Sequence, residues 1–169
     1  MRESKIIGLR NRLLQAVARM APGAKTLRVQ LHRWRGVQIG TGVWIGFDVL
    51  LETSRPHLIS IGNNVVISIR AMLIAHFRGE HSIKIEDEVF IGPGAIILPN
   101  VVIGHGSVVT AGSVVSASVP PMCVVQGNPA NVIAKTGVSL AGKASMKEFL
   151  RSLRPIRPPG VPASKARRD

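Results

Sequence analysis

A hydrophobic period of six residues runs through the second half of the chain. Between Ile83 and Val119 an aliphatic residue recurs at every sixth position, and a second series of small or branched residues lies two positions earlier. The two series are Ile85, Ile91, Ile97, Ile103, Val109 and Val115, and Ile83, Val89, Ala95, Val101, Ser107, Ser113 and Val119. A period of six fits neither an α-helix nor a plain strand, so short extended pieces must alternate with corners. The pattern predicts stacked parallel strands, as in a β-helix solenoid whose turns bury their apolar sides on one another.

The same period begins earlier and is interrupted twice. Its earlier aliphatic positions are Ile39, Ile45, Leu51, Ile61, Ile67 and Leu73. The step from Leu51 to Ile61 is four residues longer than one repeat, which predicts a short loop at residues 54–57. After Leu73 the register is kept, but Gly79 occupies an inward position, so residues 75–82 are expected to leave the wall. Three repeats make one triangular turn, and the twelve positions therefore predict about four turns. Glycines that follow aliphatic positions predict corners with permissive backbone angles, at Gly40, Gly46, Gly62, Gly92 and Gly104.

The flanks of the repeat have a different character. Residues 4–20 carry apolar residues at helical spacing and are followed by Pro22 and Gly23, which predicts an amphipathic helix that caps the coil or packs on a neighbouring subunit. Its arginines make it too charged for a signal peptide or a membrane span, and the alternative is a basic helix lying on a membrane surface. Residues 145–153 predict a short basic helix, whereas the proline-rich residues 155–169 are expected to be disordered. We divide the chain into a basic N-terminal helix and lead-in (1–36), a repeat domain (37–136) and a basic, largely disordered C-terminal extension (137–169).

Positive charge is concentrated outside the repeat. The net charge of +13 divides into +8 for residues 1–36, −1 for residues 37–136 and +6 for residues 137–169. The repeat offers neither a basic surface nor interleaved aromatic residues, so nucleic-acid binding is not expected. Basic flanks suit an anionic membrane surface, an acidic glycan or a phosphorylated cofactor. The single cysteine, Cys123, cannot form an internal disulfide and is expected to be a buried apolar residue.

The end of the repeat and the block after it carry a family resemblance. The segment VVIGHGSVVTAGSVVSASVPPMCVVQGNPANVIAK resembles the close of the hexapeptide-repeat acyltransferases. Within that family, SRPHLISIGNNVVIS followed by a short loop with a His is most similar to the capsule and lipopolysaccharide O-acetyltransferase branch. The resemblance covers residues 37–136 and implies an all-β, left-handed parallel β-helix. It also implies a cytoplasmic homotrimer with active sites between subunits, which transfers an acetyl group from acetyl-CoA to a hydroxyl of a sugar or glycan precursor without a metal.

The resemblance further implies that a His in the loop at residues 75–82 is the general base. By position this is His76, with His81 as a competitor in the same loop. An alcohol is a weak nucleophile at neutral pH, and an imidazole that titrates near neutrality can take its proton as attack begins. His105 falls on a regular corner of the coil and is expected to be a surface residue.

Other positions receive acceptor and cofactor roles from the same resemblance. Acceptor contacts fall on Asp48, Arg78, His81 and Phe90, and Asp48 alternatively holds His76. The predicted CoA contacts are Gly92, Gly94, Ala111, Gly112, Ser116 and Lys135. Pro93 has no N–H, so Gly94 or another amide would have to steady the oxyanion. The triplet that begins at Ser116 lacks the lysine usual in the family, and Lys135, Lys143 or an arginine of the flanks is expected to replace it beside the CoA phosphate.

Three other readings stay open. An amino-sugar N-acyltransferase would use the same His, because an amine makes a smaller demand on the base. A non-catalytic trimeric scaffold would leave His76 incidental. The γ-type carbonic anhydrases share the coil and bind zinc through three histidines, but position 40, where the third ligand would stand, is Gly40.

Overall fold

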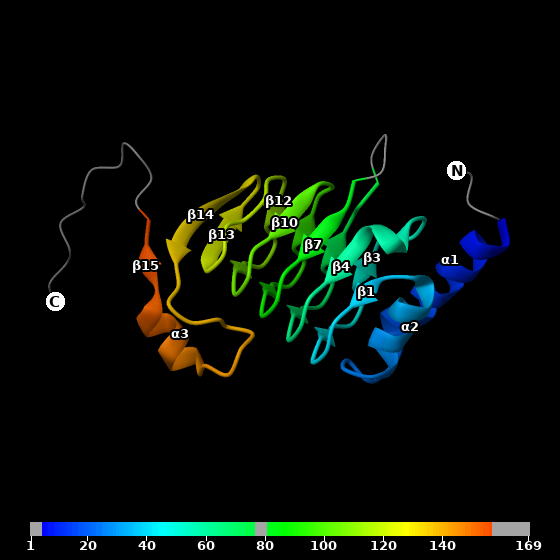
Figure 1. Cartoon of the computed structure of the whole chain (residues 1–169), viewed down its shortest axis with the longest axis horizontal. Helices are drawn as coiled ribbons and strands as arrows, with labels where there is room; N and C mark the ends of the chain where they lie inside the picture. Colours follow the sequence, from blue (N-terminus) through cyan, green and yellow to red (C-terminus); the bar gives the residue numbers. More distant parts are fainter. Residues whose placement is uncertain (1–4, 77–80, 157–169) are drawn as a thin grey trace, which may run out of the picture.

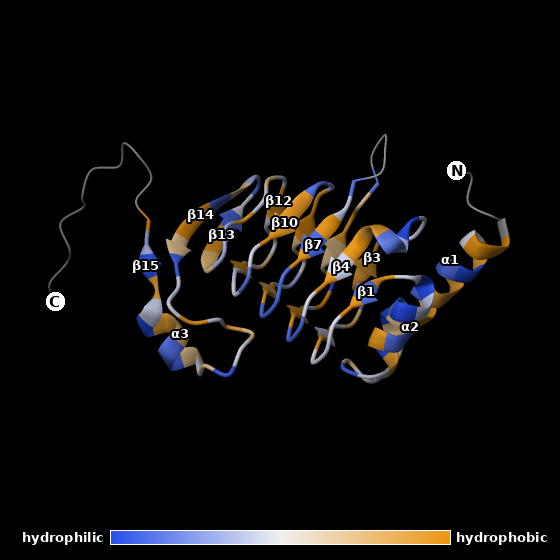
Figure 2. Ribbon diagram, in the orientation of Figure 1, coloured by the Kyte–Doolittle hydropathy of each residue, from blue (hydrophilic) through white to orange (hydrophobic). Residues whose placement is uncertain are grey.

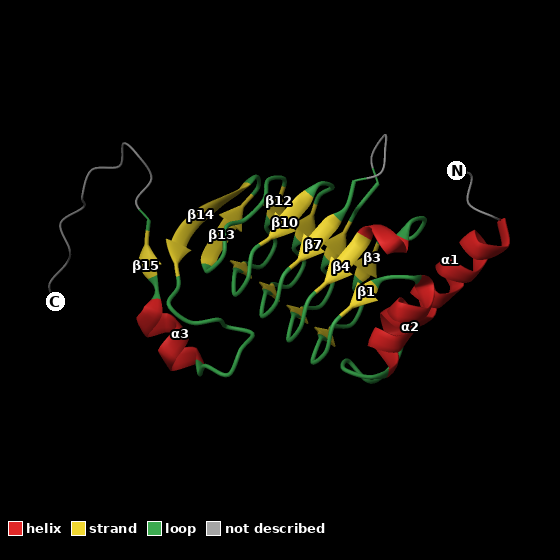
Figure 3. Cartoon of the chain, in the orientation of Figure 1, coloured by secondary structure: helices red, strands yellow, loops and turns green. Residues whose placement is uncertain are grey.

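The chain is a coil of short parallel strands with helices at both ends (Figures 1 and 3). The computed structural model describes residues 5–76 and 81–156. Its helices are α1 (Lys5–Met20), α2 (Leu27–Arg35), the short 3-10 helix η1 (Pro56–Leu58) and α3 (Met146–Ser152). Its strands are β1 (Gln38–Ile39), β2 (Trp44–Ile45), β3 (Leu50–Leu51), β4 (Ile59–Ile61), β5 (Val66–Ile67), β6 (Met72–Leu73), β7 (Ile83–Ile85), β8 (Phe90–Ile91), β9 (Ile96–Ile97), β10 (Val101–Ile103), β11 (Val108–Val109), β12 (Val114–Val115), β13 (Cys123–Gly127), β14 (Ala130–Lys135) and β15 (Arg154–Pro155).

The strands of the coil form three parallel sheets, one on each side of a triangular prism. Sheet A has the order β1-β4-β7-β10, sheet C has the order β3-β6-β9-β12, and sheet B contains β2-β5-β8-β11 followed by β13, β14 and β15. Each sheet therefore takes one strand from each of four turns. In sheet C the register joins Leu51 to Leu73, Leu73 to Ile97 and Ile97 to Val115. The predicted parallel β-helix of about four turns is confirmed.

The inward residues of this prism are those that the six-residue period marks. The six aliphatic residues from Ile85 to Val115 in the first series are each at most 1% exposed and belong to one continuous core. Two inward positions carry serine, and both hydroxyls have partners. Ser107 Oγ donates to the Pro120 carbonyl at 2.7 Å, and Ser113 Oγ accepts from the Gly127 amide at 3.2 Å. Cys123 is free and buried, as expected.

The glycines that follow the aliphatic positions have a different cause from the one predicted. Gly46 and Gly92 are not in the left-handed region of the backbone map. A Cβ at either position would stand 2.6 Å from a backbone nitrogen of the next turn, that of Ile69 or of Ala111. These residues are therefore glycine because successive turns approach closely. Positive φ values occur two residues later, for example at Asp48 and Gly94.

Three arginines of α2 close the first turn of the coil. The open end of a sheet leaves strand carbonyls without a neighbouring strand. Arg33 donates to Ile39 and Gly40 at the end of β1, and Arg28 donates to Ile45 of β2. Arg35 donates to the carbonyls of Leu51 and Glu52 at the end of β3. Part of the positive charge in the first flank is thus structural, which the sequence did not indicate.

The other end of the coil is closed by an antiparallel extension of sheet B. β13 pairs with β14, which pairs with β15, and α3 packs Phe149 on this layer. α3 begins after Ser145 with a capping box to Glu148, inside the residues predicted to be helical. The prediction of disorder is wrong for Pro155, which lies in β15, and for Ile156, whose amide donates to the Ile133 carbonyl at 2.8 Å; residues 157–169 lie outside the described part.

The N-terminal helix is confirmed, since α1 covers Lys5–Met20 and is followed by α2. Among the helices within residues 5–76 and 81–156, none combines the length and the apolar character needed to cross a membrane.

Candidate active site

The two segments that interrupt the repeat, one after β3 and one after β6, leave the coil at the same edge of the prism. The first begins at Glu52 directly after β3, and the second begins after β6 and contains Ala75 and His76. β3 and β6 are neighbours in sheet C, with Leu51 opposite Leu73. We call the edge between sheet C and sheet A the His76 edge. The residues predicted as a loop at 54–57 partly form η1, which turns the chain back toward sheet A.

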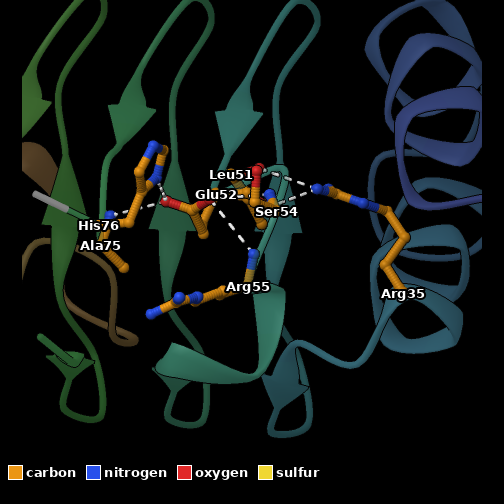
Figure 4. Close-up of polar contacts among 7 residues, drawn as sticks. All are labelled: Arg35, Leu51, Glu52, Ser54, Arg55, Ala75 and His76. Atoms are coloured by element: carbon orange, nitrogen blue, oxygen red, sulfur yellow. Dashed lines mark hydrogen bonds and ion pairs between the residues drawn. The ribbon is translucent and has the colours of Figure 1, made fainter. Parts of the chain in front are cut away.

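A carboxylate and an imidazole meet at the His76 edge. Oε2 of Glu52 lies 2.5 Å from Nδ1 of His76, as Figure 4 shows. The Glu52 side chain is 1% exposed, whereas the His76 side chain is 52% exposed. The buried Glu52 thus holds the His76 ring by Nδ1, while the exposed side of the ring, with Nε2, can reach a ligand in solvent.

Backbone amides hold the Glu52 carboxylate in place. Oε1 accepts from the amides of Ser54 at 2.8 Å and Arg55 at 3.3 Å, and Oε2 accepts from the Ala75 amide at 3.1 Å (Figure 4). Burial opposes ionisation of Glu52, but the hydrogen bonds from His76 and from the Ser54 and Arg55 amides outweigh it. Together these contacts hold the pKa of the carboxyl below its usual range. Glu52 is therefore an anion at neutral pH.

An ionised carboxylate fixes the tautomer of its His partner. A carboxylate only accepts hydrogen bonds, so the proton of a neutral His76 ring resides on Nδ1 and Nε2 keeps its lone pair. Nε2 can then take a proton from a bound group, and the adjacent negative charge stabilises the imidazolium that forms. This arrangement suits a general base.

Arg35 connects this pair to the N-terminal helices. Its guanidinium donates to the carbonyls of Leu51 and Glu52 at 3.0 and 2.5 Å (Figure 4). It also donates to Nδ1 of His32 and to Gln15 of α1. Arg35 and His32 are both buried. The strand end that carries Glu52 is therefore anchored from behind by α2.

The structure divides the predicted site residues between two edges. The His76 edge carries His76, His81 and Ser116, and both His81 and Ser116 are exposed. Arg78 lies outside the described residues. Gly92, Gly94, Ala111 and Gly112 lie together on the edge between sheets B and C, which we call the glycine edge. There the Gly112 amide donates to the Pro93 carbonyl at 2.9 Å, and a Cβ at Gly94 or Gly112 would meet no atom within 4 Å. This edge presents bare backbone.

The structure does not support a role for the Gly94 amide at an oxyanion. That amide donates to the Ile69 carbonyl at 2.9 Å and so takes part in the stacking of the turns. Since Pro93 has no N–H, neither residue of this corner offers an unused donor.

Asp48, Phe90 and Lys135 lie away from His76 within the chain. Asp48 is on the glycine edge, where Arg19 Nη2 approaches its carboxylate to 2.5 Å. The alternative that Asp48 holds His76 is therefore wrong for a single chain, because Glu52 does so. Phe90 packs with Phe149 and other residues on the outer face of sheet B rather than on a wall beside His76. Lys135 is exposed on β14, in the extension that closes the coil.

Sequence reasoning missed Glu52. A signal was present: Glu52 directly follows the inward Leu51, as the loop of His76 follows the inward Leu73, and these two positions belong to the same corner of successive turns. His105 is exposed, as predicted.

The outward row of sheet C joins the two edges and is apolar. Its residues are Leu50, Met72, Ile96 and Val114, all partly exposed. The corresponding row of sheet A is Gln38, Ser60, Lys84 and Val102. Within residues 5–76 and 81–156, no group of three or more His, Cys, Asp or Glu is placed to hold a metal ion.

Comparison with known sequences gives consistent matches. The profile of the family "Bacterial transferase hexapeptide (six repeats)" matches residues 82–117. The putative acetyltransferase YvoF of Bacillus subtilis is 32% identical over 130 residues, which are 74% of this chain and 76% of YvoF. The 2,3,4,5-tetrahydropyridine-2,6-dicarboxylate N-acetyltransferase of Clostridium perfringens is 48% identical over 67 residues, 40% of this chain and only 28% of that enzyme.

A solved structure has a related fold. Soybean serine acetyltransferase, determined in complex with serine, superposes with a TM-score of 0.52 and 30% sequence identity. The superposition covers 76% of this chain and 56% of the soybean chain. The coil of parallel strands is thus shared with a known acetyltransferase.

Proposed function

The chain belongs to the bacterial transferase hexapeptide family, and we propose that it transfers an acetyl group from acetyl-CoA to a hydroxyl of a sugar or glycan precursor. The class of acetyltransferases is supported by YvoF and by the soybean enzyme. The observation that carries the choice of a hydroxyl is the contact of His76 with the buried Glu52. A hydroxyl must lose its proton as it attacks, and it therefore makes a larger demand on a base with a charged partner than a neutral amine does.

In the proposed reaction His76 is the general base. Nε2 of His76 takes the proton of the acceptor hydroxyl while the oxygen of that hydroxyl attacks the thioester carbonyl carbon of acetyl-CoA. The C–S bond then breaks, the imidazolium returns the proton to the sulfur, and the products are the acetyl ester and free CoA. Glu52 stays ionised throughout and stabilises the imidazolium. His76 is the catalytic residue, and Glu52 positions it.

We propose a homotrimer because one chain does not bring its two site edges together. The His76 edge and the glycine edge lie on opposite sides of sheet C. If three prisms turn sheet C toward a common axis, the His76 edge of one chain meets the glycine edge of the next. The apolar row from Leu50 to Val114 would then be buried near the axis, and acetyl-CoA would lie along the bare backbone of Gly94 and Gly112 beside His76 of the adjacent chain.

Mixed trimers test this arrangement. His76→Ala removes the base from one edge, and Gly112→Trp blocks the other edge with a side chain. Each variant alone should be inactive, but co-refolded mixtures should regain activity, because some interfaces combine the two intact edges. Mixtures that stay inactive, although native mass spectrometry shows mixed trimers, would refute a shared site.

An amino-sugar N-acetyltransferase is the second candidate, favoured by the match to the Clostridium perfringens N-acetyltransferase. Acceptor pairs that differ only in a hydroxyl or an amine, such as glucose and glucosamine, separate the two reactions. We expect the product to be an acetyl ester, which hydroxylamine cleaves. A product that resists hydroxylamine would establish an amide and overturn the choice of a hydroxyl.

We further propose that the protein works in the cytoplasm, in contact with the inner face of an anionic membrane. The basic flanks support that location: residues 1–36 carry +8, of which the three α2 arginines that close the coil account for three.

A further inference from the structure

α1 packs on α2 and the coil with a mixed side that includes Asn11, Gln15 and Ala18, and it exposes its aliphatic side. Asn11, Gln15 and Ala18 are buried, and Gln15 donates to the Val49 carbonyl at 2.9 Å. The exposed residues include Leu9 at 71% and Leu13 at 64%. Together with Ile6, Val17 and Met20 they form an aliphatic stripe along the outward side of the helix. Figure 2 shows apolar residues alternating with polar ones along α1, which runs away from the coil at its N-terminal end.

The stripe continues onto the first two turns of the coil. Met20 lines one hollow with Phe47 and Ile69, two exposed apolar residues of the glycine edge. Arg19 and Arg70 lie at the same hollow. Because the proposed trimer places the glycine edge, with Phe47 and Ile69, against the next chain, we call the stripe of α1 alone the α1 surface.

Basic side chains border the α1 surface. On a helical projection Arg12 and Arg19 flank the stripe on one side and Arg10 flanks it on the other. Arg19 pairs with the Asp48 carboxylate, so the three arginines and Asp48 together carry a net charge of three minus one, or +2. No acidic residue occurs within α1.

We propose that the α1 surface docks on an anionic lipid bilayer. This inference names the surface that holds the protein at the proposed membrane, and it is independent of the reaction. A helix with an aliphatic stripe and flanking arginines lies in the interfacial plane, with the stripe among the acyl chains and the guanidinium groups at the phosphates. A second copy that meets this surface with its own α1 surface fits less well, because the arginines of the two copies would come together. None of the described helices can span the bilayer, so the contact is peripheral.

Flotation with vesicles tests the proposal on the full-length protein. We expect it to float with vesicles that contain phosphatidylglycerol at low salt, and not with phosphatidylcholine alone. The variant Arg10→Gln/Arg12→Gln should lose about thirtyfold in partitioning, since each basic residue near an anionic surface contributes about a fivefold factor. Leu9→Asp/Leu13→Asp should abolish flotation.

A matched control separates local from global effects. Met146 and Leu150 are exposed apolar residues of α3, so Met146→Asp/Leu150→Asp makes the same change of charge and polarity elsewhere. This control should still float, and all three variants should release CoA with a soluble acceptor at the wild-type rate, which keeps the test apart from the proposed reaction.

The proposal is overturned if the wild type does not float, if the α3 control loses as much vesicle binding as Leu9→Asp/Leu13→Asp, or if Leu9→Asp/Leu13→Asp dissociates the oligomer in light scattering. The last result would make the surface an interface between copies.

Discussion

Glu52→Gln is the substitution that separates positioning of the base from support of the fold. Glutamine keeps the shape of the side chain but has no charge and carries an amide N–H₂ group. It can donate to Nδ1 of His76, which would place the ring proton on Nε2 and remove the base. We therefore expect kcat to fall by about 100-fold to 10,000-fold, the scale of general-base catalysis. The KM for the acceptor should change little, because Glu52 is 1% exposed and does not face a ligand.

The same substitution should leave a folded protein. Ser54 donates to Oε1 at 2.8 Å and would keep a neutral acceptor, which costs about 1 kcal/mol, whereas Ala75 donates to Oε2 at 3.1 Å and would lose its acceptor when the N–H₂ group faces His76, which costs about 1–3 kcal/mol. The loss of about 2–4 kcal/mol is partly offset, because burial no longer opposes a charge. A domain with about 5–15 kcal/mol of stability tolerates this change.

Steady-state CoA release and urea unfolding together provide the assay. Glu86→Gln is the matched control, because Glu86 also accepts a backbone amide, that of His105 at 2.9 Å, but lies between sheets A and B. The control should retain the wild-type kcat. A folded Glu52→Gln protein with kcat within about threefold of wild type would refute the role of Glu52, as would a change confined to KM.

Two further predictions concern the fold. Burial, Arg35 and Arg28 lower the pKa of His32 from 6.5 to about 3, so as pH falls below 6.5 the unfolded chain binds a proton that the folded chain does not. The free energy of unfolding should therefore fall by about 2 kcal/mol between about pH 7.5 and about pH 5. Urea titrations at several pH values should show that the free energy of unfolding of His32→Gln depends less steeply on pH than that of the wild type. An equal dependence on pH in both proteins would contradict the assignment. Ile97→Asp places a carboxylate at an inward position that is 0% exposed and should cost several kcal/mol, enough to prevent folding, while Ile97→Val should lose only about 1 kcal/mol. Circular dichroism of a folded, stable Ile97→Asp protein would show that this position is not part of the core.

The coil could be predicted because its cause is local and repeated. In the series from Ile85 to Val115, each inward residue lies six positions after the previous one. This series therefore predicts the positions of the strands, the turns and the core residues together. The position of His76 follows from the same count, because its loop interrupts the repeat after Leu73.

The residues that sequence reasoning misplaced depend on contacts between distant segments. The partner of His76 is Glu52, 24 positions earlier, and the two meet only because β3 and β6 are neighbours in sheet C. The arginines of α2 are a basic stretch in the sequence, but their use as caps depends on where the first turn leaves its carbonyls. Phe90 fits a pocket wall by resemblance, yet in this chain the C-terminal extension covers it with Phe149.

Acceptor-dependent release of CoA from acetyl-CoA tests the central claim most directly. The wild type, His76→Ala and His105→Ala should be compared against a panel of sugars, nucleotide sugars, amino sugars and small alcohols. His105 is an exposed His on a regular corner and serves as the matched control. We predict turnover with a hydroxyl acceptor that falls by about a hundredfold or more in His76→Ala and is unchanged in His105→Ala. Wild-type turnover that survives His76→Ala would contradict the assignment of the base, and failure of the wild type to bind CoA would contradict the proposed function itself.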